Sequence, residues 1–117
     1  MRIVSILENQ KIEKRIAITP EIAKKYIALG FAVALSEKYG EHLGFNDNEY
    51  RELGVEFYKQ DSEVLNNADI IVQLGLLSDN NLLLLKENQT LVGVLNPHIN
   101  KEKIENLSKK KINIFFR

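Results

Sequence analysis

Residues 69–74 read Asp-Ile-Ile-Val-Gln-Leu, and this stretch decides the fold class because its apolar side chains are almost continuous. A strand without regular polar alternation predicts burial on both faces, as in a parallel sheet covered by helices on both sides. Other short runs rich in β-branched and apolar residues predict further strands. These runs lie at residues 2–7, 31–35, 55–58, 90–95 and 112–116.

Helices are expected between these strands. Thr19, Pro20 and Glu21 favour a helix start, because they supply an N-cap hydroxyl, a proline at the first helical position and an acidic first turn. Gly30 suits the left-handed residue that ends such a helix. The other expected helices lie at residues 46–53, capped by Asn46-Asp47 and closed by Gly54, at 61–67, capped by Asp61, and at 78–86 and 100–109, with 38–45 as a loop.

Strands and helices therefore alternate along the whole chain, which predicts parallel strands joined by right-handed crossover connections. We expect an α/β fold: a doubly wound, mostly parallel sheet of about five or six strands with helices on both faces, in a Rossmann- or flavodoxin-like lobe. The 117 residues fit a single domain. Because the chain stops in or just after the last predicted strand, we expect a fragment of a longer protein.

Composition excludes several classes of function. The 16 basic residues balance 16 acidic ones, so a basic surface for nucleic acid is absent overall. Without cysteine there is no disulfide, thiolate metal site or cysteine nucleophile, which suits a cytosolic protein. The apolar runs are too short for a signal peptide or a membrane span. His42 and His98 have no neighbours at metal-ligand spacing, so we expect no metal site.

The chain also lacks the sequence motifs of a complete nucleotide site. Neither G-x-G-x-x-G nor G-x-x-x-x-G-K-[ST] occurs, so a self-contained dinucleotide site is not expected. His98 follows Pro97 in a turn beyond a predicted strand, where open α/β sheets place functional groups. The alternative is a solvated loop histidine. No serine pairs with either histidine, so a hydrolase triad has no support.

Arg15 is a second candidate functional residue. It follows the first predicted strand and precedes the capped helix. From this position its planar guanidinium could bind a carboxylate or phosphate above the sheet. The alternative is an exposed arginine among the other charges of its loop.

The segment that holds Arg15 also carries a family resemblance. Residues 13–20, Glu-Lys-Arg-Ile-Ala-Ile-Thr-Pro, resemble the opening of alanine dehydrogenases and of the α subunit of proton-translocating NAD(P) transhydrogenase. The likeness covers essentially all 117 residues in order. It continues through LGFAV at 29–33, FND at 45–47, ADIIV at 68–72 and TLVGVLNP at 90–97. The resemblance implies that residues 1–117 are the N-terminal lobe of a two-lobe protein, without the downstream NAD-binding Rossmann lobe.

The resemblance also implies which residues face the substrate. Alanine dehydrogenases carry an arginine, a lysine and a histidine at these motifs. Arg15 takes the arginine position, whereas Gln73 and Asn96 stand where the lysine and the histidine would be. A neutral amide cannot replace a cation or a titrating group, which favours the transhydrogenase branch, although a lysine is usual there too at position 73. The residues expected to face the cleft are Arg15, Gln73, Asn96, Pro97 and His98, and none is assigned a catalytic or cofactor-binding role.

For the complete protein the resemblance implies hydride transfer between NAD(H) and NADP(H), with NADP(H) on a partner lobe. The lobe alone is expected to be inactive and to bind no cofactor. The implied partners are the downstream NAD-binding lobe, the NADP(H)-binding lobe, the transhydrogenase membrane subunits and a second copy in a homodimer. The implied location is cytoplasmic, at the inner membrane through those subunits. Two alternatives stay open: the substrate lobe of an alanine dehydrogenase-like amino-acid dehydrogenase, and a stand-alone binding module.

Overall fold

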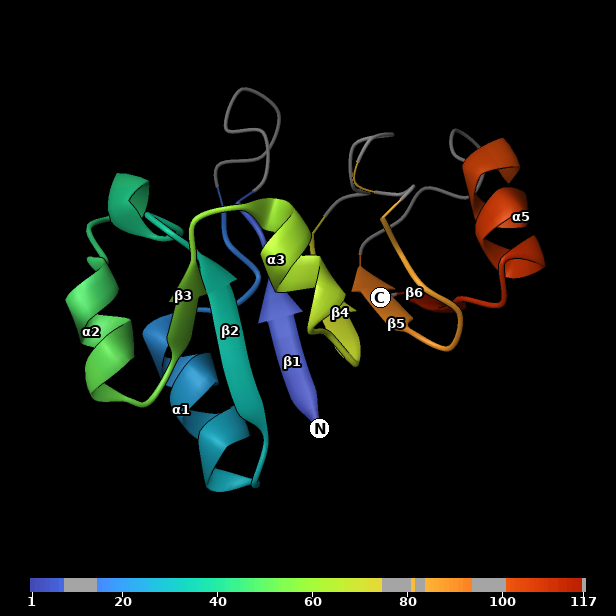
Figure 1. Cartoon of the computed structure of the whole chain (residues 1–117). Helices are drawn as coiled ribbons and strands as arrows, with labels where there is room; N and C mark the ends of the chain where they lie inside the picture. Colours follow the sequence, from blue (N-terminus) through green and yellow to red (C-terminus); the bar gives the residue numbers. More distant parts are fainter. Residues whose placement is uncertain (8–14, 75–80, 82–83, 94–100, 117) are drawn as a thin grey trace.

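The computed structural model describes residues 1–7, 15–74, 81, 84–93 and 101–116. Within these ranges strands and helices alternate as the sequence predicts (Figure 1). The elements in chain order are β1 (Arg2–Ser5), α1 (Pro20–Ala28), β2 (Ala32–Ser36), the 3-10 helix η1 (Glu41–Leu43), α2 (Asp47–Glu52), β3 (Glu56–Tyr58), α3 (Asp61–Asn66), β4 (Ile70–Val72), β5 (Thr90–Gly93), α5 (Lys101–Lys109) and β6 (Asn113–Phe116).

The described strands form one six-stranded sheet in the order β3-β2-β1-β4-β5-β6, and every neighbouring pair is parallel. The doubly wound α/β prediction is therefore confirmed. The chain starts at the centre of the sheet, runs outward to β3, and returns past β1 to add β4, β5 and β6 on the other side. The direction of winding reverses between β1 and β4, and open α/β sheets bind ligands at the carboxyl end of this switch point.

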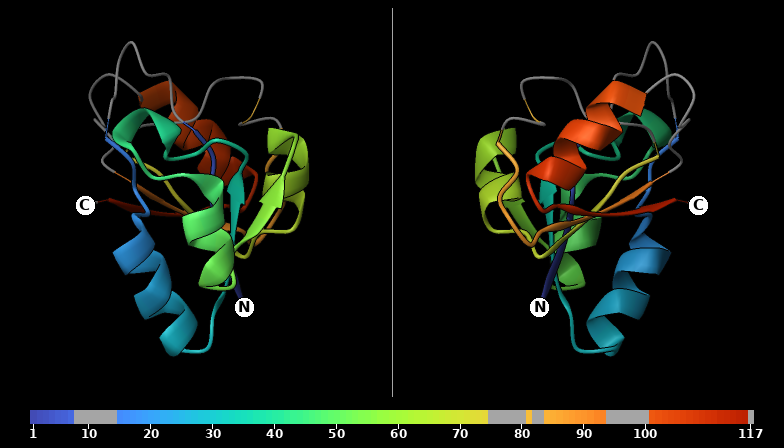
Figure 2. Two further views of the ribbon diagram at one scale, coloured as in Figure 1. Left: turned by 90° about the vertical axis from the view of Figure 1, so that its left-hand side faces the viewer. Right: turned by 90° about the vertical axis from the view of Figure 1, so that its right-hand side faces the viewer.

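Helices cover both faces of the sheet, each over its own apolar cluster. On one face α1 and α2 contribute Ala23 and Tyr50. On the other, α3 and α5 contribute Val64, Leu65 and Leu107. Figure 2 shows α1 and α3 on opposite sides of the sheet. This two-sided burial explains why the run at residues 69–74 is apolar without alternation.

Local capping interactions explain where α1 and α2 begin. The Thr19 hydroxyl accepts a hydrogen bond from the Ile22 amide at 3.3 Å, with Pro20 as the first helical residue. The Asn46 side chain accepts one from the Glu49 amide at 3.0 Å. Both N-caps were predicted from the sequence, because a cap needs only residues within one turn.

The structure corrects two predicted helix boundaries. Asp61 does not cap α3 but is its first residue, and Gln60 at the cap position makes no side-chain cap bond. The Asp61 carboxylate instead accepts a hydrogen bond from Asn81. The helix predicted to reach residue 86 has ended by Leu84, whose amide closes a turn onto the Asn81 carbonyl at 3.0 Å. Residues 75–80 and 82–83 of that prediction lie outside the described residues. The predicted loop at 38–45 contains η1.

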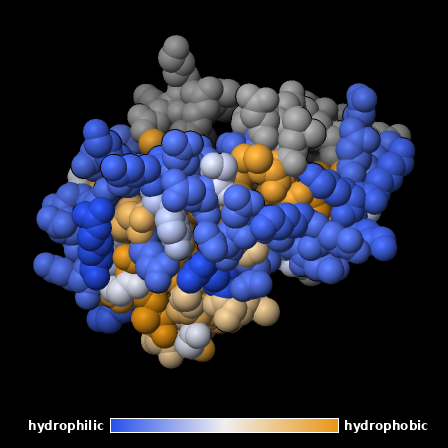
Figure 3. Space-filling view, viewed as in Figure 1, coloured by the Kyte–Doolittle hydropathy of each residue, from blue (hydrophilic) through white to orange (hydrophobic). Residues whose placement is uncertain are grey.

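Exposed apolar side chains gather at the amino end of the sheet. Met1 is 73% exposed and Leu29, after α1, is 74% exposed. Figure 3 shows the corresponding apolar surface at the lower edge of the molecule, around the N-terminus and the α1–β2 turn. In the described part of the chain no helix is long and apolar enough to span a membrane.

The α2 cap gives a test of this account of the helix boundaries. Asn46→Ala removes the acceptor for the Glu49 amide, so the free energy of unfolding should fall by about 1 kcal/mol. Urea denaturation measures this change. Asn48→Ala, an exposed change inside the same helix, should shift the free energy by less than about 0.5 kcal/mol. Equal effects of the two substitutions would contradict the capping role.

Candidate functional site

Buried polar side chains gather where β1, β2 and β4 end. Ser5, Ser36 and Gln73 are 0%, 5% and 1% exposed, and they stand at or just after the carboxyl ends of these strands. In Figure 1 the carboxyl ends of β1 and β2 point upward. These residues therefore lie at the switch-point end of the sheet, where ligands of open α/β sheets bind.

The Gln73 amide closes the sheet between β1 and β4. The last residues of the β1–β4 ladder are Val4 and Ile71, and continued register would place Ile6 opposite Gln73. There the Gln73 side chain replaces the backbone: its Oε1 accepts from the Ile6 amide at 2.8 Å, and its Nε2 donates to the Ile6 carbonyl at 3.0 Å. The Ile6 amide can only donate, so the orientation of the Gln73 amide is fixed.

A chain of buried hydroxyls continues from Gln73. The Ser5 hydroxyl donates to Gln73 Oε1 at 2.8 Å and lies 2.8 Å from the Tyr39 hydroxyl. Because the single Ser5 proton points to Gln73, the Tyr39 hydroxyl must donate to Ser5. The Tyr39 oxygen in turn accepts from the amides of Ala17 and Ile18 at 3.1 and 3.2 Å. The hydrogen bonds therefore all run in one direction, from the 17–18 backbone to the Gln73 oxygen.

Tyr50 holds the same backbone segment from α2. Its hydroxyl donates to the Ile18 carbonyl at 2.8 Å, and its ring packs edge-on against Tyr39 with the ring centroids 6.3 Å apart. Gly40 is required beside it, because a Cβ on Gly40 would lie 3.1 Å from the Tyr50 hydroxyl oxygen. Two tyrosines thus bind both backbone groups of Ile18.

Burial controls the ionisation of Tyr50. Removal from solvent, followed by the negative potential of Tyr39, Glu49 and Asp47, raises its pKa well above the ordinary value of 10.0. Tyr50 therefore stays a hydrogen-bond donor throughout the neutral and mildly alkaline range.

Arg15 lies on the segment that the two tyrosines hold. It is exposed, two residues before the fixed Ala17 amide. The segment leads directly into the Thr19 cap of α1. The arginine is therefore carried by backbone that is anchored at its following residues, close to the switch-point end of the sheet.

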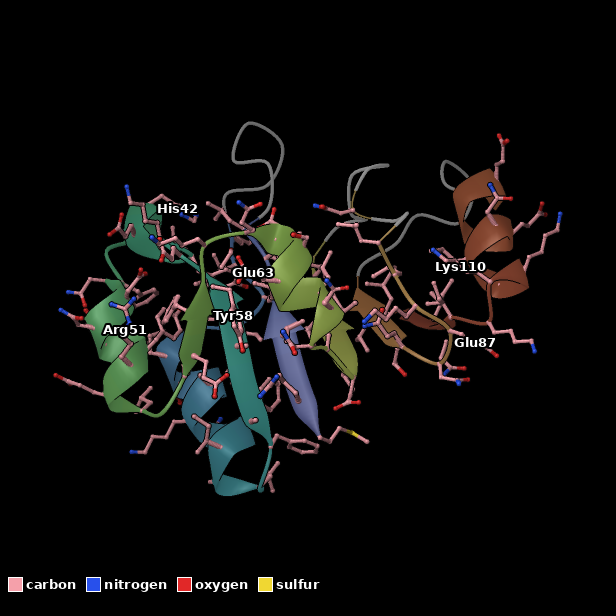
Figure 4. The ribbon with its side chains drawn as sticks, in the orientation of Figure 1. His42, Arg51, Tyr58, Glu63, Glu87 and Lys110 are labelled. Atoms are coloured by element: carbon pink, nitrogen blue, oxygen red, sulfur yellow. The ribbon has the colours of Figure 1, made fainter. Side chains whose placement is uncertain are left out.

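The other predicted cleft residues differ in how they are placed. Gln73 is buried within this lobe, and its role toward a substrate in the complete protein stays a prediction. Asn96, Pro97 and His98 lie outside the described residues, after β5 ends at Gly93. No cluster of three or more potential metal ligands occurs in the described part of the chain. His42 is exposed on η1, and Figure 4 shows it on the upper side of the molecule.

The geometry can be compared with known proteins. The family model described as alanine dehydrogenase/PNT, N-terminal domain, matches residues 6–116. The chain belongs to this family. The first portion of the NAD(P) transhydrogenase alpha subunit of Rickettsia prowazekii (strain Madrid E) is 37% identical to it, over 98% of this chain and 31% of that protein. The chain thus spans about a third of the length of this relative.

Solved structures of the alanine dehydrogenase/PNT family show the same fold. An L-alanine dehydrogenase matches with a TM-score of 0.90 at 19% identity, covering 99% of this chain and 32% of that one. The transhydrogenase from Sinorhizobium meliloti matches with a TM-score of 0.86 at 22% identity, covering 97% of this chain and 34% of that one. The predicted family and fold are confirmed together.

Sequence reasoning missed the hydroxyls of this family member's network. Ser5 lies inside a predicted strand, Tyr39 in a predicted loop and Tyr50 in a short helix. Their partners are 21 to 68 residues away in sequence, so no local spacing reveals the contacts. The one available signal is that Ser5 and Ser36 interrupt otherwise apolar strands near their carboxyl ends.

The raised pKa of Tyr50 predicts a specific loss of stability in alkali. The unfolded state loses the Tyr50 proton near pH 10, whereas the folded state retains it, so this contribution is present below pH 10 and declines as pH rises beyond it. Tyr50→Phe should flatten the fall in the free energy of unfolding between about pH 9 and pH 11. Urea denaturation at a series of pH values measures it. The control Tyr26→Phe, on α1, should keep the wild-type slope, and an unchanged slope in Tyr50→Phe would contradict the assignment.

Proposed function

We propose that this chain is the N-terminal lobe of a transhydrogenase α subunit, which in the complete protein serves hydride transfer between NAD(H) and NADP(H). The observation that carries the proposal is the similarity to the Rickettsia subunit along nearly the whole chain. The described lobe supplies a rigid sheet and an anchored arginine. Both suit a reaction whose protein contribution is to orient two nicotinamides.

The residues at the switch point do not fit a nucleotide. A Rossmann site needs a glycine-rich turn after the first strand, so that the pyrophosphate can approach the backbone. Residues 6–18 contain no glycine, and the Gln73 amide occupies the space between β1 and β4 at Ile6. NAD(H) is therefore assigned to a downstream lobe of the complete protein, and NADP(H) to a partner lobe.

The buried amide of Gln73 opposes the alternative of an alanine dehydrogenase-like lobe. Binding and deaminating an amino acid needs a cation for the carboxylate and a titrating group for the proton. At position 73 this chain has a neutral side chain that is turned into the sheet. The close structural likeness to an L-alanine dehydrogenase is a likeness of fold.

The same proposal includes the partners. The complete subunit would join this lobe to an NAD-binding lobe and dock on membrane subunits from the cytoplasmic side. A homodimer would bury apolar surface such as that at Met1 and Leu29, which are the most exposed large apolar side chains described. A stand-alone binding module, the remaining alternative, would instead function without these partners.

Arg15 gives the test of the proposed function. In the complete protein, Arg15→Ala should lower the rate of hydride transfer from NADH to an NADP+ analogue on the order of tenfold, the loss expected for one charge-assisted hydrogen bond. Stability should change by less than about 0.5 kcal/mol, since the residue is exposed. Lys24→Ala removes another exposed cation, on α1, and should leave the rate unchanged.

Two results would contradict this proposal. A normal rate in Arg15→Ala would remove the arginine from the reaction. Reduction of NAD+ that depends on alanine, together with absent transfer between NADH and the NADP+ analogue, would assign the complete protein to the alanine dehydrogenase branch.

A further inference from the structure

We infer that Gln73 is a positioning residue: through Ser5 and Tyr39 it sets the place of the backbone segment that carries Arg15. The inference deepens the proposed function and rests on it for the role of Arg15. It replaces a substrate-facing role of Gln73 with an indirect one. The carrying observation is one continuous chain of buried hydrogen bonds from β4 to residues 17–18.

The first end of this chain is fixed by the sheet. The backbone amide of Gln73 donates to the Val92 carbonyl at 2.9 Å, which ties the residue to β5. Its side chain binds both backbone groups of Ile6, just beyond β1. Gln73 therefore has one position, determined by strands on both sides of it.

The chemistry of the chain requires an acceptor at position 73. The Ser5 hydroxyl and the Ile6 amide both donate to the same Gln73 oxygen. An ammonium group there has three donors and no acceptor, so it would leave the Ile6 amide unpaired and turn the Ser5 proton away. Buried unpaired donors are costly. The neutral amide is thus tied to the direction of every bond that follows.

The far end of the chain fixes the segment that carries the arginine. With the Ser5 proton on Gln73, Tyr39 gives its proton to Ser5 and keeps its oxygen lone pairs for the Ala17 and Ile18 amides. If Ser5 turned its proton toward Tyr39, it would compete with these amides for the same oxygen. The position of residues 15–18 therefore depends on the acceptor at Gln73.

A second buried glutamine provides a matched control. Gln89 is 5% exposed and also makes three side-chain bonds, to the Lys86 amide and to the carbonyls of Leu65 and Ala68. It precedes β5, so it lies at the opposite end of the sheet from Gln73. Gln73→Met and Gln89→Met both remove a buried amide, but only the first interrupts the chain to residues 17–18.

Residue-resolved amide hydrogen exchange on this chain tests the inference. Gln73→Met should speed exchange of the Ala17 and Ile18 amides at least about tenfold relative to other amides of α1 and β1, because the Tyr39 oxygen no longer serves them alone. Gln89→Met should change these two amides only in step with global stability. Equal local effects of the two variants, or no local effect of Gln73→Met, would overturn the inference.

A second pair of variants keeps the test decisive if Gln73→Met does not fold. Ser5→Ala cuts the link between Gln73 and Tyr39 but keeps both Gln73 bonds to Ile6. Ser36→Ala removes a neighbouring buried hydroxyl that accepts from the Leu7 amide and lies outside the chain of bonds. Ser5→Ala should speed exchange at Ala17 and Ile18, and Ser36→Ala should not. The reverse order would overturn the inference.

The link to activity is tested separately in the complete protein. If Gln73 acts through Arg15, Ser5→Ala should lower hydride transfer severalfold in the wild-type background and cause no further loss in Arg15→Ala. Additive losses would overturn the indirect role of the chain of bonds. Failure of Arg15→Ala alone to affect transfer would count against the proposed function, while the exchange results would still decide the positioning role.

Discussion

The pair of hydrogen bonds between the Gln73 side chain and the Ile6 backbone determines what this lobe can do. Without it, β1 and β4 would leave an open switch point beyond Val4 and Ile71, as in sheets that bind nucleotides there. The side chain instead satisfies the Ile6 amide and carbonyl, which are buried backbone groups that must find partners. Closing the sheet in this way also presents one oxygen to Ser5, and the orientation of the hydroxyl network follows from that oxygen.

This constraint separates two functions that the same fold can serve. An open switch point would make the lobe a nucleotide-binding unit, whereas a closed one makes it a support for groups carried above the sheet. The anchored segment that bears Arg15 is such a group, since Tyr39 and Tyr50 bind the backbone at Ile18 from two elements. The arrangement favours a lobe that completes a site formed with another part of the protein, as we propose for the transhydrogenase α subunit.

The fold was predictable because its signals are local. The apolar run at residues 69–74 indicates two-sided burial, and Thr19 and Asn46 cap helices through contacts within one turn. The site was only partly predictable. Arg15 could be singled out by its place after the first strand, but the partners of Gln73 lie 67 and 68 residues away. The Asp61 error has the same cause, because Asn81 takes the carboxylate that local spacing assigned to a cap.

The central claim is that the switch point of this lobe is closed and holds no nucleotide by itself. Calorimetric titration of NADH into the 117-residue chain tests it most directly, because the measurement needs no partner and no assumption about catalysis. The account predicts no saturable heat, since Gln73 occupies the position between β1 and β4 and no glycine turn follows β1. Saturable binding at micromolar concentration would contradict it and would make this sheet edge a nucleotide site.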